Sequence, residues 1–294
     1  MLDAIVRNHL PIVFVLALFS ASARIATGQV RRLSAIEHRS RAVVLVAETS
    51  EGRIVAAAGM ERALTMRRAS GSLFKLPIAV ALLRSGHFNP LTPHRCNGRE
   101  KINGVERTCW IGSGHGDIRF VDALSTSCNI YFRTAARMIS RSEVIRAARD
   151  LGMYHDVGSP SDAQRILGDD QLLEGATSLT PGDLIRTAVV FATRGRVSRT
   201  GQQLDLRSGR YDPLYRGLRK GVVDGTSHGA WTRRFTIAGK TGTAPLIPGG
   251  RRSVGWFIGF APIDHPRFAV VVAIDDARGS DAATLAREAL EQML

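Results

Sequence analysis

The stretch Ser72-Leu73-Phe74-Lys75 opens an apolar run that continues to Leu83 and stops at Gly86. A serine and a lysine three residues apart at the start of a helix share one face, so their side chains can meet. Two further short motifs follow in order, Ser127-Cys128-Asn129 and Lys240-Thr241-Gly242-Thr243. Each motif alone is a weak signal. The ordered set predicts a serine acyl-transfer site that works without a histidine base.

Lysine is rare in this chain: of its 40 basic residues 36 are arginines, and the four lysines are Lys75, Lys101, Lys220 and Lys240. Two of the four stand in the motifs. Arginine stays charged in proteins, whereas burial can lower the pKa of a lysine until its amine is neutral. Because a serine hydroxyl is a poor nucleophile until a base removes its proton, we predict that Lys75 is the base for Ser72.

The second motif is expected to move protons and hold the substrate. Ser127 would relay a proton between Lys75 and the leaving amine, while Asn129 would bind the substrate's amide carbonyl and orient Lys75. The backbone N–H groups of Ser72 and Thr243 would form an oxyanion hole, in which each donor is typically worth about 2.7–4 kcal/mol.

The third motif is expected to lie on a strand at the edge of the cleft. Lys240 would add positive charge, and the hydroxyls of Thr241 and Thr243 could bind a terminal carboxylate. Gly242 is expected to let the substrate backbone run close along the strand, because a glycine in a strand often marks a close approach.

Three cysteines and a histidine suggest a second site. Cys96, Cys109, His115 and Cys128 are separated by intervals of 13, 6 and 13 residues. Three cysteines cannot all pair in disulfides within one chain, and Cys/Cys/His/Cys is a suitable ligand set for tetrahedral zinc. A structural zinc would brace the second motif, although no cofactor is expected for catalysis. Two alternatives stay open: a Cys96–Cys109 disulfide beside a free buried Cys128, or His115 as a turn residue between two glycines with neither zinc nor disulfide.

The apolar pattern predicts an α+β fold. Five runs have strand character and are separated by turn residues, at 42–47, 53–58, 235–244, 253–260 and 267–274. We expect one domain over 31–294: a five-stranded antiparallel sheet flanked by helices, with an all-helical subdomain inserted. The α/β part would cover about 41–86 and 222–294, and the helical part about 87–221. Ser140 with Glu143, and Thr180-Pro181, predict helix starts in this part.

The N-terminus and the net charge bear on location. Arg7 and His9 precede an uncharged run from Leu10 to Ala23, which ends in Ala-Ser-Ala. Residues 1–30 are therefore expected to be a signal peptide or a membrane anchor, and the domain to be extracytoplasmic, in the periplasm or cell envelope.

The net charge of the chain is +14. Its arginines are spread along the chain without a nucleic-acid-binding signature, so we expect no nucleic acid but a solvated basic surface, or one lying against anionic lipid or an acidic wall polymer.

From about Arg41 to the C-terminus the chain resembles the penicillin-binding protein transpeptidases and their serine β-lactamase relatives. Beyond the three motifs, the resemblance rests on the flanks of the second and third, namely Cys109-Trp110, Gly114-His115-Gly116, Ala123-Leu124, Tyr131-Phe132, Gly239 and Ala244. The second-motif segment is similar to that of class B, elongation-type enzymes. One departure is Glu174-Gly175-Ala176, where the family usually has a Gly-Gln-Gly type segment.

The resemblance implies acyl transfer on the D-Ala-D-Ala ends of peptidoglycan stem peptides, with β-lactams acylating Ser72. Other expected partners are a membrane surface or other cell-wall synthesis proteins. One alternative is a β-lactamase or D,D-carboxypeptidase, in which water resolves the acyl-enzyme. The other is a non-catalytic β-lactam or peptidoglycan-binding module, kept open because the chain has no room for the long N-terminal pedestal of class B enzymes.

Overall fold

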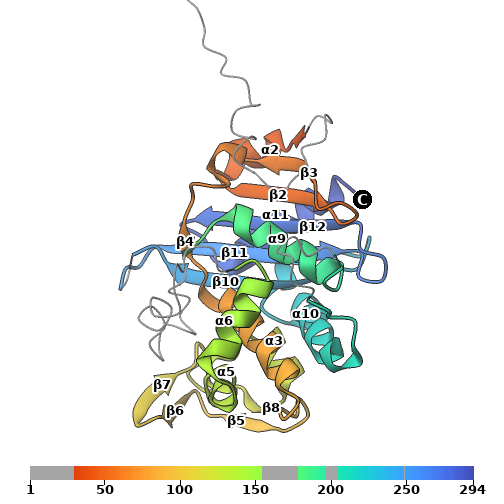
Figure 1. The fold of residues 1–294 in the computed structure, drawn as a ribbon. Helices are drawn as coiled ribbons and strands as arrows, with labels where there is room; N and C mark the ends of the chain where they lie inside the picture. Colours follow the sequence, from red (N-terminus) through yellow and green to blue (C-terminus); the bar gives the residue numbers. More distant parts are fainter. Residues whose placement is uncertain (1–29, 154–177, 197–203, 248) are drawn as a thin grey trace, which may run out of the picture.

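The computed structural model describes residues 30–153, 178–196, 204–247 and 249–294. A six-stranded sheet with the order β1-β3-β2-β12-β11-β10 lies at its centre (Figure 1). Five of the strands pair antiparallel and correspond to the five predicted runs. They are β2 (Val43–Glu48), β3 (Ile54–Ala58), β10 (Ala238–Pro245), β11 (Ser253–Ala261) and β12 (Phe268–Asp275).

The sixth strand was not expected. β1 (Arg31–Arg32) pairs in parallel with β3, so the predicted count of five antiparallel strands is one short. Two exposed arginines carry no alternation of apolar and polar residues, and a two-residue strand therefore leaves no periodic signal in the sequence.

Both faces of the sheet are buried. In β2, Leu45 belongs to the apolar cluster that includes α9 (Pro181–Ala192), whereas its neighbour Val44 belongs to the cluster that includes α11 (Gly279–Glu291). α9 and α11 accordingly cover opposite faces (Figure 1). Because successive strand residues point to opposite faces, burial of both faces requires continuous apolar runs, as the sequence has in β2 and β12.

The first motif joins a 3-10 turn to a helix. Gly71–Phe74 form the turn, and α3 follows over Lys75–Ser85, so the helix predicted from Ser72 begins with a tighter first turn. Its side chains are buried from Lys75 to Leu83, and Gly86 ends it in the left-handed conformation with φ 81°. This burial explains the uninterrupted apolar run of the sequence.

The prediction of an all-helical insertion is wrong. Between α3 and α6 the chain forms two small antiparallel pairs, β5 with β8 and β6 with β7. Asn103 and Gly104 have φ of 51° and 80° and form the two-residue turn between β6 and β7. Asn-Gly is the strongest local hairpin signal, whereas strands this short and charged show no periodicity. The four strands are β5 (His94–Cys96), β6 (Arg99–Ile102), β7 (Val105–Thr108) and β8 (Gly116–Ile118).

The remaining α-helices of the described residues are α2 (Ser34–Ser40), α4 (Phe120–Ser125), α5 (Asn129–Ala135), α6 (Arg141–Asp150) and α10 (Asp212–Asp224). Short pairing also joins β4 (Arg68–Ala69) to β9 (Ser178–Leu179). The predicted helix starts are confirmed, since Ser140 with Glu143 caps α6 and Thr180 with Asp183 caps α9. Each cap satisfies backbone N–H groups that have no partner within the helix.

Two features of the sequence lie outside the described residues. They are the N-terminal segment up to residue 29, expected to be a signal peptide or anchor, and Glu174-Gly175-Ala176. Among the described helices, none combines the length and the apolar character that a membrane span requires.

Candidate active site

The three motifs converge on one buried amine. Lys75 Nζ donates to Ser72 Oγ at 2.8 Å, to Asn129 Oδ1 at 2.7 Å and to Ser127 Oγ at 3.3 Å. Ser72 and Lys75 come from the 3-10 turn and the start of α3, while Ser127 and Asn129 come from the turn that leads into α5. The arrangement places the nucleophile candidate within hydrogen-bond reach of its base.

A second buried lysine, Lys240 on β10, contacts Ser127 from the side of the sheet. Lys240 Nζ donates to Ser127 Oγ at 2.9 Å and to the Thr241 carbonyl at 2.9 Å. In the part of the chain that the structure describes, the hydrogen-bond partners of Lys75 and Lys240 are hydroxyls, an amide oxygen and a backbone carbonyl. No carboxylate among them holds either amine in its charged form.

Burial shifts both lysines toward the neutral amine. Desolvation disfavours the ammonium form and lowers the pKa of Lys75 to about 8. Burial, and then the nearby charge of Lys75, lower the pKa of Lys240 well below its ordinary value. A base works best when its pKa lies near the operating pH, so Lys75 is suited to accept the proton of Ser72.

Ser127 adopts a backbone conformation that few side chains tolerate. Its φ is 57°, in the left-handed region, and its side chain is 5 % exposed. Such a conformation costs on the order of 1–3 kcal/mol and persists only where the surroundings fix it. Here it places Oγ between the amines of Lys75 and Lys240.

Two glycines bring the nucleophile turn against β10. Gly71 has φ 52°, and a Cβ there would lie 2.5 Å from the Thr243 carbonyl oxygen. A Cβ on Gly242 would lie 2.8 Å from the Ser70 carbonyl oxygen. The backbones of Ser72 and Thr243, the expected oxyanion-hole donors, are thereby held close together. The structure thus gives a further reason for glycine at position 242: the missing Cβ admits the chain's own turn at Ser70.

The two threonines of the third motif lie in different surroundings. Thr241 is buried, and its hydroxyl donates to Thr226 Oγ1 at 2.9 Å. Thr243 is exposed, and its Oγ1 accepts the N–H of Gly279 at 3.0 Å, at the start of α11. Sequence reasoning missed Thr226, because a single threonine in a loop carries no motif. Thr243 is the hydroxyl that faces solvent on β10, the edge strand of the sheet.

The three cysteines and the histidine also converge. Their ligand atoms all lie within 4.8 Å of one another. Cys109 Sγ is 3.4 Å from His115 Nδ1 and 3.9 Å from Cys128 Sγ, and Cys96 Sγ is 3.7 Å from His115 Nδ1. All three cysteines are free and buried, so the alternative Cys96–Cys109 disulfide is not formed in this structure.

The spacing of these atoms fits zinc. Bonds of about 2.3 Å to sulfur and about 2.0–2.1 Å to nitrogen in a tetrahedron separate the ligand atoms by roughly 3.5–3.8 Å. The hydrogen bond with the Cys128 thiol lowers the pKa of Cys109 and favours its thiolate, the form that binds metal. Cys128 also caps α5 by accepting the N–H of Tyr131. A metal here would therefore hold the residue between Ser127 and Asn129.

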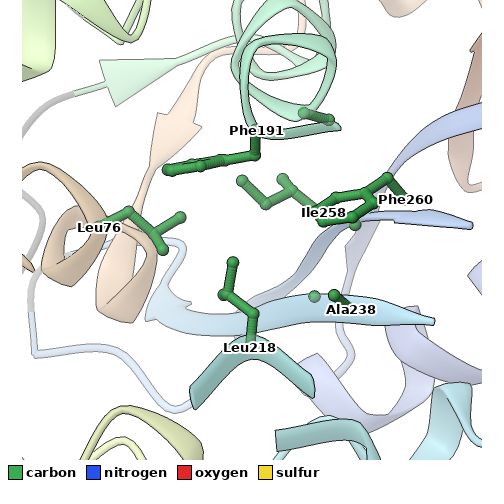
Figure 2. A pocket seen from close by; sticks show the side chains of 9 residues that line it. Leu76, Phe191, Leu218, Ala238, Ile258 and Phe260 are labelled. Carbon is green, nitrogen blue, oxygen red and sulfur yellow. The ribbon is translucent and has the colours of Figure 1, made fainter. Parts of the chain in front are cut away.

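A small cavity is lined by residues of α3, α9, α10, β10 and β11 (Figure 2). Leu76, next to Lys75, and Gly239, next to Lys240, form part of its wall. Figure 2 shows the side chains of Phe191 and Leu218 pointing into the same space. The lining is apolar, and apolar cavities of this kind stay dry, so the cavity is a packing gap and not a substrate site.

Most of the chain matches a known protein family. The family model of the penicillin binding protein transpeptidase domain matches residues 42–292. The chain belongs to this family. Its α+β fold is the fold of the family's solved members. With Pseudomonas aeruginosa PBP2, solved in complex with WCK 5153, it shares a TM-score of 0.75 at 20 % identity, over 89 % of this chain and 75 % of that one.

Similar proteins of known role are longer than this chain. Stage V sporulation protein D of Bacillus subtilis is 22 % identical over 248 residues, which are 71 % of this chain and 38 % of that protein. The peptidoglycan D,D-transpeptidase MrdA of Acinetobacter baumannii is 25 % identical over 240 residues, 63 % of this chain and 36 % of that protein. The chain thus spans little more than a third of the length of these transpeptidase-family relatives.

A further structural neighbour was solved with a second protein. PBP2 of Helicobacter pylori, in its complex with MreC, has a TM-score of 0.72 and 17 % identity. The match covers 88 % of this chain and 62 % of that one. At this identity the likeness concerns the fold alone.

Proposed function

We propose that this protein is a serine D,D-transpeptidase that acts on the D-Ala-D-Ala ends of peptidoglycan stem peptides, and that penicillins acylate Ser72. One observation carries the proposal: the buried Lys75 amine touches Ser72, Ser127 and Asn129 at once. Membership of the transpeptidase family and the similarity to MrdA support the reaction class.

Acylation would begin with proton transfer from the Ser72 hydroxyl to neutral Lys75. Ser72 Oγ then forms a bond to the carbonyl carbon of the penultimate D-Ala, and the N–H groups of Ser72 and Thr243 stabilise the oxyanion. As the C–N bond breaks, the departing amine of the terminal D-Ala takes a proton from Lys75 through Ser127. Lys240, bonded to Ser127, favours this path because it fixes the relay hydroxyl.

Deacylation would run the same path in reverse. The amine of a neighbouring stem peptide gives a proton to Lys75 through Ser127 and attacks the ester carbon. The new amide forms, the bond to Ser72 Oγ breaks, and Ser72 recovers its proton from Lys75. The same groups thus serve as acid and base in turn, and no net proton is consumed.

Substrate alignment would use the exposed edge of β10. An extended peptide can pair with an edge strand through backbone hydrogen bonds. The Thr243 oxygen already accepts the Gly279 N–H, so its own hydrogen is available for a terminal carboxylate. Thr241, bonded to Thr226, would support the strand, and its hydroxyl would reach the carboxylate only after turning away from Thr226.

The test is covalent labelling. The purified protein, incubated with a fluorescent penicillin, is expected to carry one label per chain, and Ser72→Ala to abolish labelling with an unchanged melting temperature. Ser142→Ala, which changes an exposed serine on α6, is the matched control and should label like the unchanged protein. Stoichiometric labelling of Ser72→Ala would refute the assignment of the nucleophile.

The acceptor separates transpeptidation from hydrolysis. The adduct is expected to persist for minutes to hours, because the described partners of Lys75 and Lys240 include no carboxylate that could activate water. With a D-Ala-D-Ala peptide and a D-amino acid acceptor, the product mass should be that of the exchanged peptide. Rapid turnover of a chromogenic cephalosporin would instead indicate a β-lactamase, and release of D-Ala without exchange a D,D-carboxypeptidase. Labelling with no product of either kind would indicate a non-catalytic binding module.

A structural zinc is part of the proposal. Cys96, Cys109, His115 and Cys128 would hold it, and it would supply no catalytic chemistry, only a brace for the turn carrying Ser127 and Asn129. We expect about one zinc per chain by elemental analysis of protein prepared without added metal. A content below about 0.2 zinc per chain would contradict it.

The location is proposed to be extracytoplasmic, because the family's D-Ala-D-Ala substrate belongs to the cell wall. The Helicobacter pylori relative solved with MreC suggests that other cell-wall synthesis proteins are partners. Fractionation of cells that express the tagged chain would test the location, with a cytoplasmic pool contradicting it.

A further inference from the structure

The one polar side-chain atom of Trp110 bonds to the turn that carries Ser127. Its side chain is 57 % exposed, yet the indole Nε1–H donates to the backbone carbonyl of Thr126 at 3.0 Å. The ring also meets His115 edge-to-face, with 5.7 Å between ring centroids. More than half of the surface of Trp110 is exposed, so replacing the indole by another aromatic ring should change global stability little.

The Thr126 carbonyl belongs to the peptide unit that leads into Ser127. The N–H of this unit donates to the Leu124 carbonyl at 3.3 Å, a long bond. Trp110 therefore holds one end of the peptide plane and Leu124 the other. The φ of Ser127 measures rotation about the bond that leaves this plane, so the orientation of the plane fixes where the Ser127 side chain points.

We propose that Trp110 is a positioning residue whose indole N–H keeps Ser127 in its left-handed conformation. In that conformation Ser127 Oγ lies within hydrogen-bond reach of both Lys75 and Lys240. Without the indole N–H the Thr126 carbonyl bonds to water, the peptide unit can rotate, and release of the left-handed backbone favours that rotation. Ser127 then leaves the two amines. The inference rests on the proposed function, because its readout is acylation of Ser72.

The test substitutes the donor and keeps the ring. Trp110→Phe retains an aromatic side chain without the N–H, and Trp231→Phe, at a tryptophan 36 % exposed beside His228, is the matched control. The second-order rate constant for acylation by fluorescent penicillin is expected to fall about tenfold in Trp110→Phe, because small displacements of a proton-transfer group are costly. It should stay within about twofold of the unchanged protein in Trp231→Phe, and both melting temperatures should stay within about 2 °C.

A double-mutant cycle shows whether Trp110 acts through Ser127. In a Ser127→Ala background the relay hydroxyl is already gone, so Trp110→Phe should then cost less than about twofold. An equal fold-loss in both backgrounds, or a rate for Trp110→Phe within twofold of the unchanged protein, would overturn the inference. Absence of labelling in the unchanged protein would instead refute the proposed function.

Discussion

The central sheet and the segment 87–150, here called the insert, are stabilised in different ways. In the sheet, β2 and β12 bury apolar side chains on both faces, under α9 and α11. In the insert, the strands are three or four residues long, and their buried sulfurs gather around one histidine. Packing thus holds the first region, whereas a cluster of side chains suited to bind a metal lies among the short strands of the second.

The active site takes its groups from both regions. Ser72 comes from the 3-10 turn that contacts β10, Lys75 from the start of α3, and Lys240 from β10 itself. Ser127 and Asn129 belong to the insert. Acylation therefore depends on how firmly the insert is held against the sheet. Perturbing one region at a time should separate stability from catalysis.

The largest expected effect is the loss of stability caused by a substitution in the core of the sheet. Leu45→Ala removes a fully buried side chain and should lower the free energy of unfolding by about 2–5 kcal/mol, through lost burial and the cavity left behind. Val105→Ala, at a half-exposed position in the insert, is the control and should change it by less than about 0.5 kcal/mol. Urea titrations measure both. Equal effects of the two substitutions would contradict the comparison.

Chelation should act on the insert. Removing the proposed zinc should slow penicillin acylation about 10- to 100-fold, because Ser127 and Asn129 would lose their support at Cys128. The melting temperature should fall at the same time, since metal binding is part of the folding free energy. Leu45→Ala, by contrast, should acylate at the normal rate while folded. Loss of stability with reductant but not with chelator would contradict the metal and favour a disulfide.

The same contrast explains what the sequence could predict. Strands with buried faces leave long apolar runs, so the five antiparallel strands were found, and the ordered motifs identified Ser72, Lys75 and Lys240. β1 and the strands of the insert were missed because strands of two to four residues with few apolar side chains leave no periodic pattern. Asn103-Gly104 did carry a signal, a two-residue hairpin turn, that an all-helical reading of the segment overlooked.

Other parts of the site depend on geometry that no single residue type encodes. The left-handed Ser127, the Thr241–Thr226 bond and the Trp110–Thr126 bond join residues through backbone position. The cysteine spacing indicated zinc but left a disulfide open, since spacing does not fix which atoms converge. Only the folded arrangement brings the four candidate ligand atoms within 4.8 Å of one another.

The pH dependence of the acylation rate should report the pKa of Lys75, whose amine contacts Ser72 outside the insert and Ser127 within it. Burial lowers the pKa of Lys75 to about 8, and acylation needs the neutral amine, so the rate should rise about fivefold from pH 7 to 8, about twofold more above pH 8, and then level off. Ser127→Ala removes an acceptor of the ammonium hydrogens and should move this limb to lower pH while the plateau falls. Acylation rates between pH 6 and 10 measure both. A flat profile would exclude Lys75 as the base.

The lowered pKa of Lys75 also makes the free energy of unfolding depend on pH. Below pH 8 the folded and unfolded chains both carry the proton, and the cost of burying it is present in full. Between pH 8 and about 10.5 the unfolded chain still holds the proton that the folded chain has lost, so this group makes stability rise with pH. Lys75→Met should remove that rise in urea titrations.

The smallest effect compares two glycines with nearly the same φ, one at the end of α3 and one inside the insert. Gly86 ends α3 and Gly104 turns the hairpin of the insert, with φ of 81° and 80°, and nothing lies within 4 Å of a Cβ at either. Alanine at each should therefore cost backbone strain alone, about 1 kcal/mol.

One apolar cluster contains residues of both regions, Leu45 and Phe120 among them. With zinc bound, both substitutions should therefore lower the same cooperative transition equally. After chelation the insert is already loosened, so Gly104→Ala should cost less while Gly86→Ala keeps its cost. Equal costs after chelation, measured by urea unfolding, would show that packing alone holds the insert.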